Sequence, residues 1–166
     1  MILPNRRLLN LAAALACAGM MAFALYSQHV LLLDPCPLCI LQRIAVIAIG
    51  LVFLVAAVHN PGQVGSRIYA VFAVAFAVAG AAVAGWHVRL QNLPADEVPS
   101  CGPGLEYMVE NFPLKDILGM VLKGSGECAD VAWSFLGLTM PTWVLINVIL
   151  LGLFALWNNA FRRLEQ

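Results

Sequence analysis

Residues 68–88 read IYAVFAVAFAVAGAAVAGWHV and carry no formal charge. A helix needs about 20 mostly apolar residues to cross the hydrocarbon core of a bilayer, and this stretch supplies them. Three further stretches share the pattern, at residues 9–27, 40–58 and 135–157, and the only charged residue within them is Arg43. Backbone groups inside lipid must bond to one another, so we predict that all four stretches are membrane-spanning helices.

The composition excludes several classes of protein. The chain has 166 residues, of which 62% are hydrophobic and 11% are charged, whereas soluble domains have about 25% charged residues. A soluble domain of about 150 residues buries only about 70% of its chain surface, which is too little to hide so many apolar side chains. The nine basic and nine acidic residues cancel, so no net charge points to nucleic acid. The sequence therefore predicts an all-α integral membrane protein in which residues 1–166 form one four-helix transmembrane domain.

The arginines indicate how the predicted helices are oriented. Five of them lie on one side of the four spans, before the first, between the second and third, and after the fourth: Arg6, Arg7, Arg67, Arg162 and Arg163. Because Lys and Arg concentrate in cytoplasmic loops, both termini are predicted to be cytoplasmic. A short external loop at about 28–39 and a long one at about 89–134 then face the other side.

The N-terminus also allows a second interpretation. A basic pair followed by an apolar run and the small-residue stretch Ala22-Phe23-Ala24 is typical of a cleaved signal peptide. The apolar run, however, continues to Leu33. Cleavage would also leave only three spans and would remove the charge asymmetry, so we expect this segment to remain as the first span.

Four of the five cysteines fall on the predicted external side. Cys36 and Cys39 form a Cys-x-x-Cys motif at the start of the second span, and Cys101 and Cys128 lie near the two ends of the long loop. Cys17 lies inside the first span, where a free thiol packs as a small hydrophobe. One Cys-x-x-Cys with an isolated cysteine at each end of a loop fits paired zinc knuckles poorly, so no metal is expected.

Two interpretations of the external cysteines remain. The external space is oxidising, so they could form structural disulfides, and a bridge between Cys101 and Cys128 would add about 3 kcal/mol or more in the chain-entropy model. A Cys36–Cys39 bridge closes almost no loop and would stabilise the fold little. Short Cys-x-x-Cys rings are instead the usual redox-active arrangement.

The surroundings of this motif also favour redox chemistry. Pro35 and Pro37 exclude a helix through Cys36, and Pro37 suits the first helical turn. The thiols are therefore predicted at a helix N-terminus, where the helix dipole stabilises a thiolate. Arg43 shares the helix face of Cys39 four residues later. A cation there costs about 2.5–3.5 kcal/mol unless it snorkels to the interface or finds a partner such as a thiolate or a polar ligand.

The long loop contains one predicted helix. It lies between Pro113, a start signal, and Gly124, a stop signal. Five apolar residues recur on one of its faces: Leu114, Ile117, Leu118, Val121 and Leu122. Such a short amphipathic helix can lie on the outer membrane surface or pack on top of the bundle. In both arrangements it would hold Cys128 close to Cys36.

Together these features resemble the DsbB family, bacterial inner-membrane oxidases that reoxidise a periplasmic thiol oxidase with quinone. The resemblance covers nearly the whole chain. It includes the four spans, Cys36 and Cys39 at the start of the second, and Arg43 four residues later. It continues through the loop, from Cys101-Gly102-Pro103 to GSGEC at 124–128, and into WSFLGLTMPTW at 133–143. No single piece is specific, but the combination is.

The resemblance implies a mechanism. The thiolate of a DsbA-like, thioredoxin-fold partner would attack Cys101, the released Cys128 would attack Cys36, and Cys39 would pass electrons to ubiquinone or menaquinone. Arg43 would stabilise the Cys39 thiolate and the reduced quinone. The resemblance also implies that the protein lies in the bacterial inner membrane.

Four further residues are candidates for contact with the quinone. His87 near the outer end of the third span could line its site or be an interfacial histidine, and Gln42 could bond a quinone oxygen or only a carbonyl. Met140 and Trp143 fit the interfacial belt, with quinone contact as the alternative.

A rival function is a small four-span scaffold or transporter subunit whose cysteines are only structural. It explains the topology equally well, but not a Cys-x-x-Cys at a helix start with Arg43 beneath it. A relative that serves one dedicated partner also fits the sequence.

Overall fold

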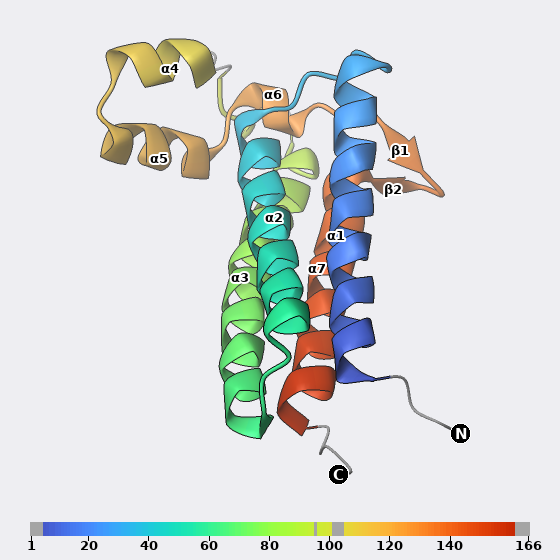
Figure 1. Ribbon diagram of the computed structural model, residues 1–166. Coiled ribbons are helices and arrows are strands. Elements are labelled where there is room, and N and C mark those ends of the chain that lie inside the picture. The colour runs from blue at the N-terminus through green and yellow to red at the C-terminus, as the bar shows by residue number, and fades with distance from the viewer. Residues whose placement is uncertain (1–4, 95, 101–104, 162–166) are drawn as a thin grey trace.

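A computed structural model describes residues 5–94, 96–100 and 105–161 of the protein (Figure 1). Four long helices run side by side, and each is long and apolar enough to cross a membrane. They are α1 (Arg6–His29), α2 (Pro37–His59), α3 (Gln63–Gln91) and α7 (Met140–Ala155), which continues as the π-helix η1 (Leu156–Phe161). The predicted fold class, an all-α membrane protein with a four-helix bundle, is confirmed.

The helix boundaries follow local sequence signals. Cys36 is the N-cap of α2 and Pro37 occupies its first turn, as predicted. Asn60 ends the helix with a φ of 44°, a left-handed conformation that Asn tolerates better than most residues. The fourth helix begins at Met140, later than the predicted start at 135, because a short β-hairpin precedes it.

Small residues let the helices approach closely. α2 packs against α1 and α3, and α3 packs against α7. A Cβ on Gly80 would lie 3.0 Å from the Cβ of Ala45, and a Cβ on Gly152 would lie 3.0 Å from that of Ala77. Lipid offers no hydrophobic drive between helices, so such close packing is what holds them together. Larger side chains fill the interior between the helices: Val46, Ile49, Phe53 and Val148.

The end of the bundle where α1 begins and η1 ends, called the terminal end here, holds a buried polar cluster. Arg6 Nη1 donates to Ser66 Oγ at 3.0 Å. Asn10 Oδ1 accepts from the side-chain amides of both Asn158 and Asn159 at 2.9 Å. These bonds join α1 to α3 and to η1, so they fix which helices meet at this end.

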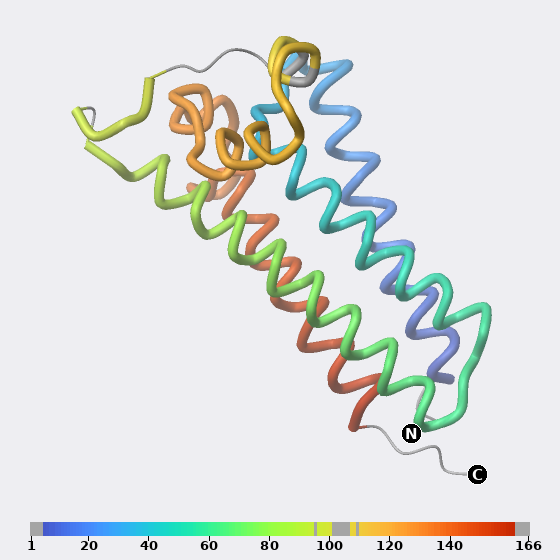
Figure 2. The backbone as a smooth tube through the Cα atoms, turned by 90° about the vertical axis from the view of Figure 1, so that its left-hand side faces the viewer, coloured from blue at the N-terminus to red at the C-terminus, as the bar shows by residue number. Residues whose placement is uncertain are grey.

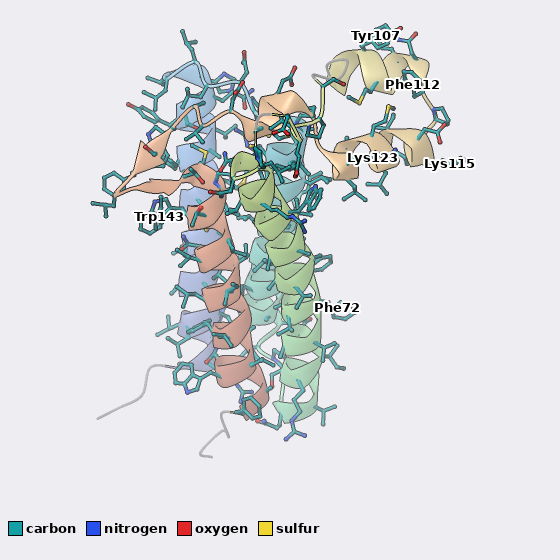
Figure 3. All side chains as sticks on the ribbon, turned by 180° about the vertical axis from the view of Figure 1, so that it is seen from behind. Phe72, Tyr107, Phe112, Lys115, Lys123 and Trp143 are labelled. Carbon is teal, nitrogen blue, oxygen red and sulfur yellow. The ribbon has the colours of Figure 1, made fainter. Side chains whose placement is uncertain are left out.

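The segment between α3 and α7 covers the opposite end of the bundle, called the cysteine end here (Figures 1 and 2). It forms α4 (Leu105–Asn111), α5 (Leu114–Lys123), α6 (Gly126–Ala129), β1 (Ser134–Phe135) and β2 (Leu138–Thr139). Helices α4 and α5 form an arm beside the bundle, and Figure 3 labels Tyr107, Lys115 and Lys123 on it. Cys101 lies outside the described residues.

The predicted amphipathic helix is α5, which follows Pro113 and ends at Gly124, as expected. Its inner face buries Ile117 and Val121 in a cluster with Met108 of α4, against which Leu41 of α2 packs. Its outer face leaves three leucines exposed: Leu114, Leu118 and Leu122. One half of the apolar stripe therefore packs on protein, and the other half remains available to a membrane surface.

The β-hairpin forms an aromatic wall at the cysteine end. It turns through Leu136 and Gly137, whose φ values of 52° and 78° are those of a type I′ turn. Trp133 and Phe135 stack with ring centroids 6.1 Å apart. The Trp143 Nε1 of α7 donates to the carbonyl of Phe135 at 3.2 Å, which ties the hairpin to the helix that follows it (Figure 3).

Candidate active site

The Cys-x-x-Cys pair lies at the start of α2. Cys36 precedes the helix as its N-cap and Cys39 lies in its first turn. Both are half-buried free thiols, and their Sγ atoms lie 3.1 Å apart. The sulfurs need to approach by only about 1 Å to reach disulfide bonding distance. The first turn of α2 therefore holds the pair ready to interconvert between dithiol and disulfide.

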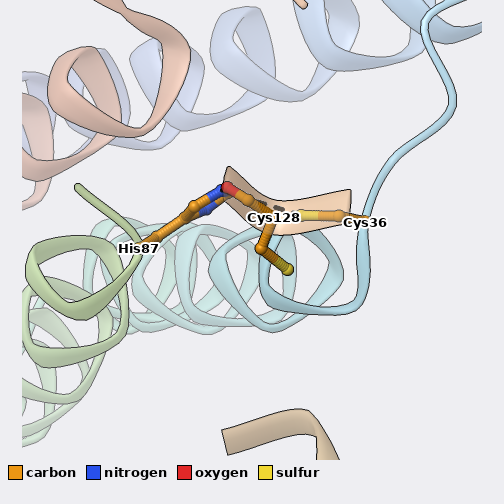
Figure 4. A group of neighbouring side chains, drawn as sticks. All are labelled: Cys36, His87 and Cys128. Atoms are coloured by element: carbon orange, nitrogen blue, oxygen red, sulfur yellow. Dashed lines mark hydrogen bonds between the residues drawn. The ribbon is translucent and has the colours of Figure 1, made fainter. Parts of the chain in front are cut away.

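Cys128 reaches the same point from the loop. It lies in α6, fully buried at 0% exposure, in a cluster with Leu38 of α2 and Leu90 of α3. Its Sγ, the Cys36 Sγ and a ring nitrogen of His87 all lie within 4.8 Å of one another (Figure 4). The sequence-based expectation that Cys128 lies close to Cys36 is met in this structure.

The environment of Cys128 affects how readily its thiol loses a proton. Hydrogen bonding to Cys36 and burial raise the pKa of the Cys128 thiol above its usual range. The Cys128 thiol is therefore favoured over the thiolate in this arrangement.

His87 lies between the two groups of thiols and is buried at 2% exposure. Its Nε2 lies 3.0 Å from the Cys128 carbonyl oxygen, and its Nδ1 lies 2.9 Å from the amide nitrogen of Gln42. A carbonyl only accepts and an amide NH₂ only donates, so these partners select the neutral ring with its proton on Nε2. That nitrogen also lies 3.8 Å from the Cys36 Sγ. His87 can therefore hold a proton beside the reacting sulfur.

Arg43 lies one turn below the thiols, as its spacing predicts. Its Nη1 donates to Oε1 of Gln28 at 2.6 Å, and its Nη2 donates to the Ala24 carbonyl at 3.1 Å. Both acceptors belong to the last turns of α1. These bonds hold the half-buried guanidinium between α1 and α2, on the wall of a cavity that Cys36 and Cys39 also line.

That cavity has a volume of about 130 Å³ and lies between the helices at the cysteine end. The predicted site residues Cys36, Cys39, Gln42, Arg43 and His87 all line it. A second and more apolar cavity, of about 420 Å³, adjoins it. The two cavities share five wall residues: Met20, Ala24, Trp133, Met140 and Val144.

The sequence analysis missed two polar residues of the site. Gln28 was assigned to the external loop, but it lies in α1 and accepts a hydrogen bond from Arg43. The signal was available, because an intramembrane arginine needs an acceptor and Gln28 is a polar residue at the same end of the first span. Gln91 also lines the first cavity, and its Oε1 is buried without a hydrogen-bond partner among the described residues.

The two candidates from the fourth span also line these cavities. Met140 lies on the wall of both, whereas Trp143 lines the second only. Cys36, Cys39 and His87 line the first cavity, and Cys128 lies beside Cys36 and His87, so the arrangement suits thiol–disulfide exchange.

Comparison with known proteins gives the same chemistry. A family model described as Disulfide bond formation protein DsbB matches residues 6–158. The chain belongs to the DsbB family. A relative from Nitrosococcus oceani, named Disulfide bond formation protein B, is 56% identical over 86% of this chain and 84% of its own length. A relative of the same name from Methylococcus capsulatus is 54% identical over 98% of this chain and 100% of its own length.

Membership of the DsbB family extends what the fold and the site indicate. The protein is a multi-pass membrane protein of disulfide bond formation, with a disulfide oxidoreductase role. In this DsbB chain the described cysteines divide accordingly. Cys36, Cys39 and Cys128 gather at the cysteine end, whereas Cys17 packs in the bundle interior at 2% exposure.

Proposed function

We propose that the protein reoxidises a soluble, periplasmic, thioredoxin-fold dithiol oxidase and passes the electrons to a membrane quinone. One observation carries the proposal. Cys128 of the loop and the Cys36–Cys39 pair of α2 meet beside a cavity that opens toward apolar, aromatic walls. Electron transfer from a soluble donor to a lipid-soluble acceptor requires that a cysteine of the external loop lie close to the cysteine pair at the membrane.

The electrons would move by successive thiol–disulfide exchanges. A partner thiolate attacks Cys101 of the Cys101–Cys128 disulfide, and the released Cys128 attacks Cys36 of the Cys36–Cys39 disulfide. The second partner thiol then displaces Cys101, and Cys101 displaces Cys36 from Cys128. The partner leaves as a disulfide, the loop disulfide is restored, and Cys36 and Cys39 hold two electrons and two protons. The short distance between the Cys128 and Cys36 sulfurs supports the central step.

The two adjoining cavities fit a quinone. Bound quinone would supply a sink for two electrons and two protons. Arg43, Gln42 and His87 would hold its polar ring beside Cys39. Phe135 of β1 and Trp133, which precedes the strand, line the second cavity, whose apolar walls suit a hydrocarbon tail. Ubiquinone and menaquinone share the features that these walls would recognise, so the proposal covers both.

The proposed location is the bacterial inner membrane, with both termini in the cytoplasm. Among the described residues, three of the basic residues that support this orientation lie at the terminal end: Arg6, Arg7 and Arg67. Arg7 and Arg67 are exposed there, whereas Arg6 is buried in the polar cluster. Reporter fusions placed after the C-terminus and near Gln63 should be active only as cytoplasmic reporters. Activity of an external reporter at either point would contradict the orientation.

A reconstituted reaction tests the proposed function. The purified protein in detergent is mixed with a reduced thioredoxin-fold oxidase and a quinone, and quinone absorbance and partner thiols are followed together. We expect one quinone reduced per partner disulfide formed. Cys17→Ala is the matched control, because Cys17 is a buried thiol away from the site and should not affect the rate.

The rival functions give different results in this assay. A scaffold or transporter subunit would leave both the partner thiols and the quinone unchanged. Partner oxidation without quinone reduction would exclude quinone as the acceptor. A protein with one dedicated partner would oxidise that partner and leave a general thioredoxin-fold oxidase reduced.

A further inference from the structure

We propose that the fully reduced protein binds one Zn²⁺ ion through Cys36, Cys128 and His87. The three side chains come from the start of α2, from α6 and from the outer end of α3 (Figure 4). Two thiolates and an imidazole are a preferred ligand set for this ion. The proposal does not depend on the identity of the electron acceptor.

The distances between the ligand atoms suit a tetrahedral ion. With Zn–S bonds of about 2.3 Å and Zn–N bonds of about 2.0–2.1 Å, neighbouring ligand atoms lie about 3.5–3.8 Å apart. The Cys36 Sγ and His87 Nε2 lie 3.8 Å apart, and all three ligand atoms lie within 4.8 Å of one another. The ligands therefore need to close by at most about 1 Å, which side-chain rotation supplies.

Gln42 can adapt His87 to a metal. Ligation through Nε2 requires the ring proton to move to Nδ1, and that nitrogen must then donate to an acceptor. The Gln42 amide nitrogen lies 2.9 Å from Nδ1, so a half-turn of the amide group places its oxygen there instead. Gln42 is itself buried at 3% exposure and is held in place by packing. Gln42 can thus supply the second contact of the histidine, while the bond from Nε2 to the Cys128 carbonyl is given up to the metal.

The site exists in only one oxidation state of the protein. A Cys36–Cys39 disulfide removes one ligand, and a Cys101–Cys128 disulfide removes another. Binding Zn²⁺ would release two thiol protons and would transfer no electrons. The ion would therefore select the reduced protein and hold Cys36 and Cys128 apart from their disulfide partners, so it would arrest turnover at that stage.

The experiment measures binding directly, without a partner or a quinone. The protein is purified in detergent, reduced, freed of reductant without oxygen, and titrated with Zn²⁺ against a chromogenic chelator. We expect one ion per chain in the reduced protein and at least a tenfold weaker affinity in the oxidised protein. Equal binding in both states, or none in the reduced state, would overturn the proposal.

Variants locate the ion. His87→Ala and Cys128→Ala should each weaken binding at least tenfold, whereas His59→Ala and Cys17→Ala should bind as the unaltered protein does. Gln42→Leu should weaken binding about 10- to 100-fold, because it removes the contact to Nδ1. Unchanged affinity in Cys128→Ala or His87→Ala would overturn the proposed ligand set.

A second measurement needs no variant. Co²⁺ added to the reduced protein in place of Zn²⁺ should give thiolate-to-metal charge-transfer absorption and the visible bands of a tetrahedral ion. The same bands in the oxidised protein, or bands without thiolate charge transfer in the reduced protein, would contradict the proposal. Zn²⁺ binding and quinone reduction are thus tested separately, and either one can be found without the other.

Discussion

Each end of the bundle holds an arginine hydrogen-bonded to a glutamine of a neighbouring helix. At the cysteine end Arg43 donates to Gln28 at 2.6 Å, and at the terminal end Arg6 donates to Gln63 at 3.0 Å. The surroundings differ. Arg43 lines a cavity together with thiols, whereas Arg6 adjoins asparagine amides that bond one another. The same pair of residue types therefore serves a reactive site at one end and helix assembly at the other.

This difference separates two kinds of polar burial in a membrane protein. In a closed cluster such as that around Asn10, side-chain amides from different helices bond one another, so its loss should lower stability. An open cluster such as that around Cys36 surrounds a cavity whose wall includes thiols. Its loss should lower activity. Measuring both quantities for each variant tests the distinction.

The largest expected effect is at the thiols. Replacing any one of Cys36, Cys39, Cys101 or Cys128 by Ser should abolish partner reoxidation, because each exchange needs both sulfurs of a pair. The Cys101→Ser and Cys128→Ser proteins should still exchange electrons between Cys36–Cys39 and quinone. The check is partner thiol content over time, at matched expression. Near-normal turnover in Cys36→Ser would remove the motif from the reaction.

The next effect is at Arg43. Arg43→Ala removes charge-assisted contacts worth about 1.5–3 kcal/mol, so quinone reduction should slow about 10- to 100-fold. Arg43→Lys keeps the charge but not the planar fork that reaches both Gln28 and the Ala24 carbonyl, so it should be intermediate. Quinone-reduction rates over a range of quinone concentrations measure this. Arg67→Ala is the control, because Arg67 is an exposed arginine at the terminal end. An equal loss of rate in Arg67→Ala would indicate impaired membrane insertion instead of impaired quinone reduction.

The terminal end should respond in stability. Asn10→Ala deprives Asn158 and Asn159 of their shared acceptor. It should lower the free energy of unfolding by about 1–2 kcal/mol, more than the loss of one interhelical hydrogen bond, because several such bonds are lost together. The melting temperature in detergent should fall by a few degrees, while the quinone-reduction rate stays unchanged. Asn111→Ala is the control, because its amide donates to the Tyr107 carbonyl of its own helix and it lies away from both cavities. A slower reaction in Asn10→Ala with an unchanged melting temperature would contradict the comparison.

The smallest effects are expected at the two glutamines that bond the arginines, Gln28 and Gln63. Gln28→Ala should slow quinone reduction only a few-fold, because Arg43 keeps its charge and its bond to the Ala24 carbonyl. Gln63→Ala should leave the rate unchanged and lower the melting temperature by about 1–3 degrees. Both quantities are measured on both proteins. The same profile for the two variants would mean that the ends do not differ as described.

The sequence was sufficient to predict the bundle and the thiol pair. An apolar run as long as residues 68–88 can only be a membrane-spanning helix in lipid. Pro37 favours the first turn of a helix, so it places Cys36 and Cys39 together at a helix start. The α5 helix could be predicted for a similar reason, since its periodicity and its boundary residues are local. The start of α7 could not, because the hairpin before it is as apolar as the helix.

Other parts of the site depend on contacts between distant segments. His87 and Cys36 meet across two helices, and no spacing in the sequence relates them. The sequence analysis weighed a metal site on the cysteines alone, whereas the zinc site proposed above also needs His87, which the fold brings beside Cys36 and Cys128. The sequence analysis gave Arg43 the interface, a thiolate or a polar ligand as its surroundings, and it did not foresee the bonds to Gln28 and the Ala24 carbonyl, because these follow from how α1 packs on α2.

The buried position of Cys128 limits how the length of the loop before it can change in evolution. Gly124 has a φ of 80°, and a Cβ there would meet the side chains of Leu90 and Leu38, so the chain passes close over α2 and α3 just before Cys128. Upstream of Gly124 and outside α4 and α5, added or lost residues would cost little, since each doubling of a loop costs only about 0.6 kcal/mol. Between Gly124 and Cys128, one inserted residue would displace the sulfur from Cys36. Length differences among related chains should therefore collect before Gly124, leaving the last five positions up to Cys128 constant in number.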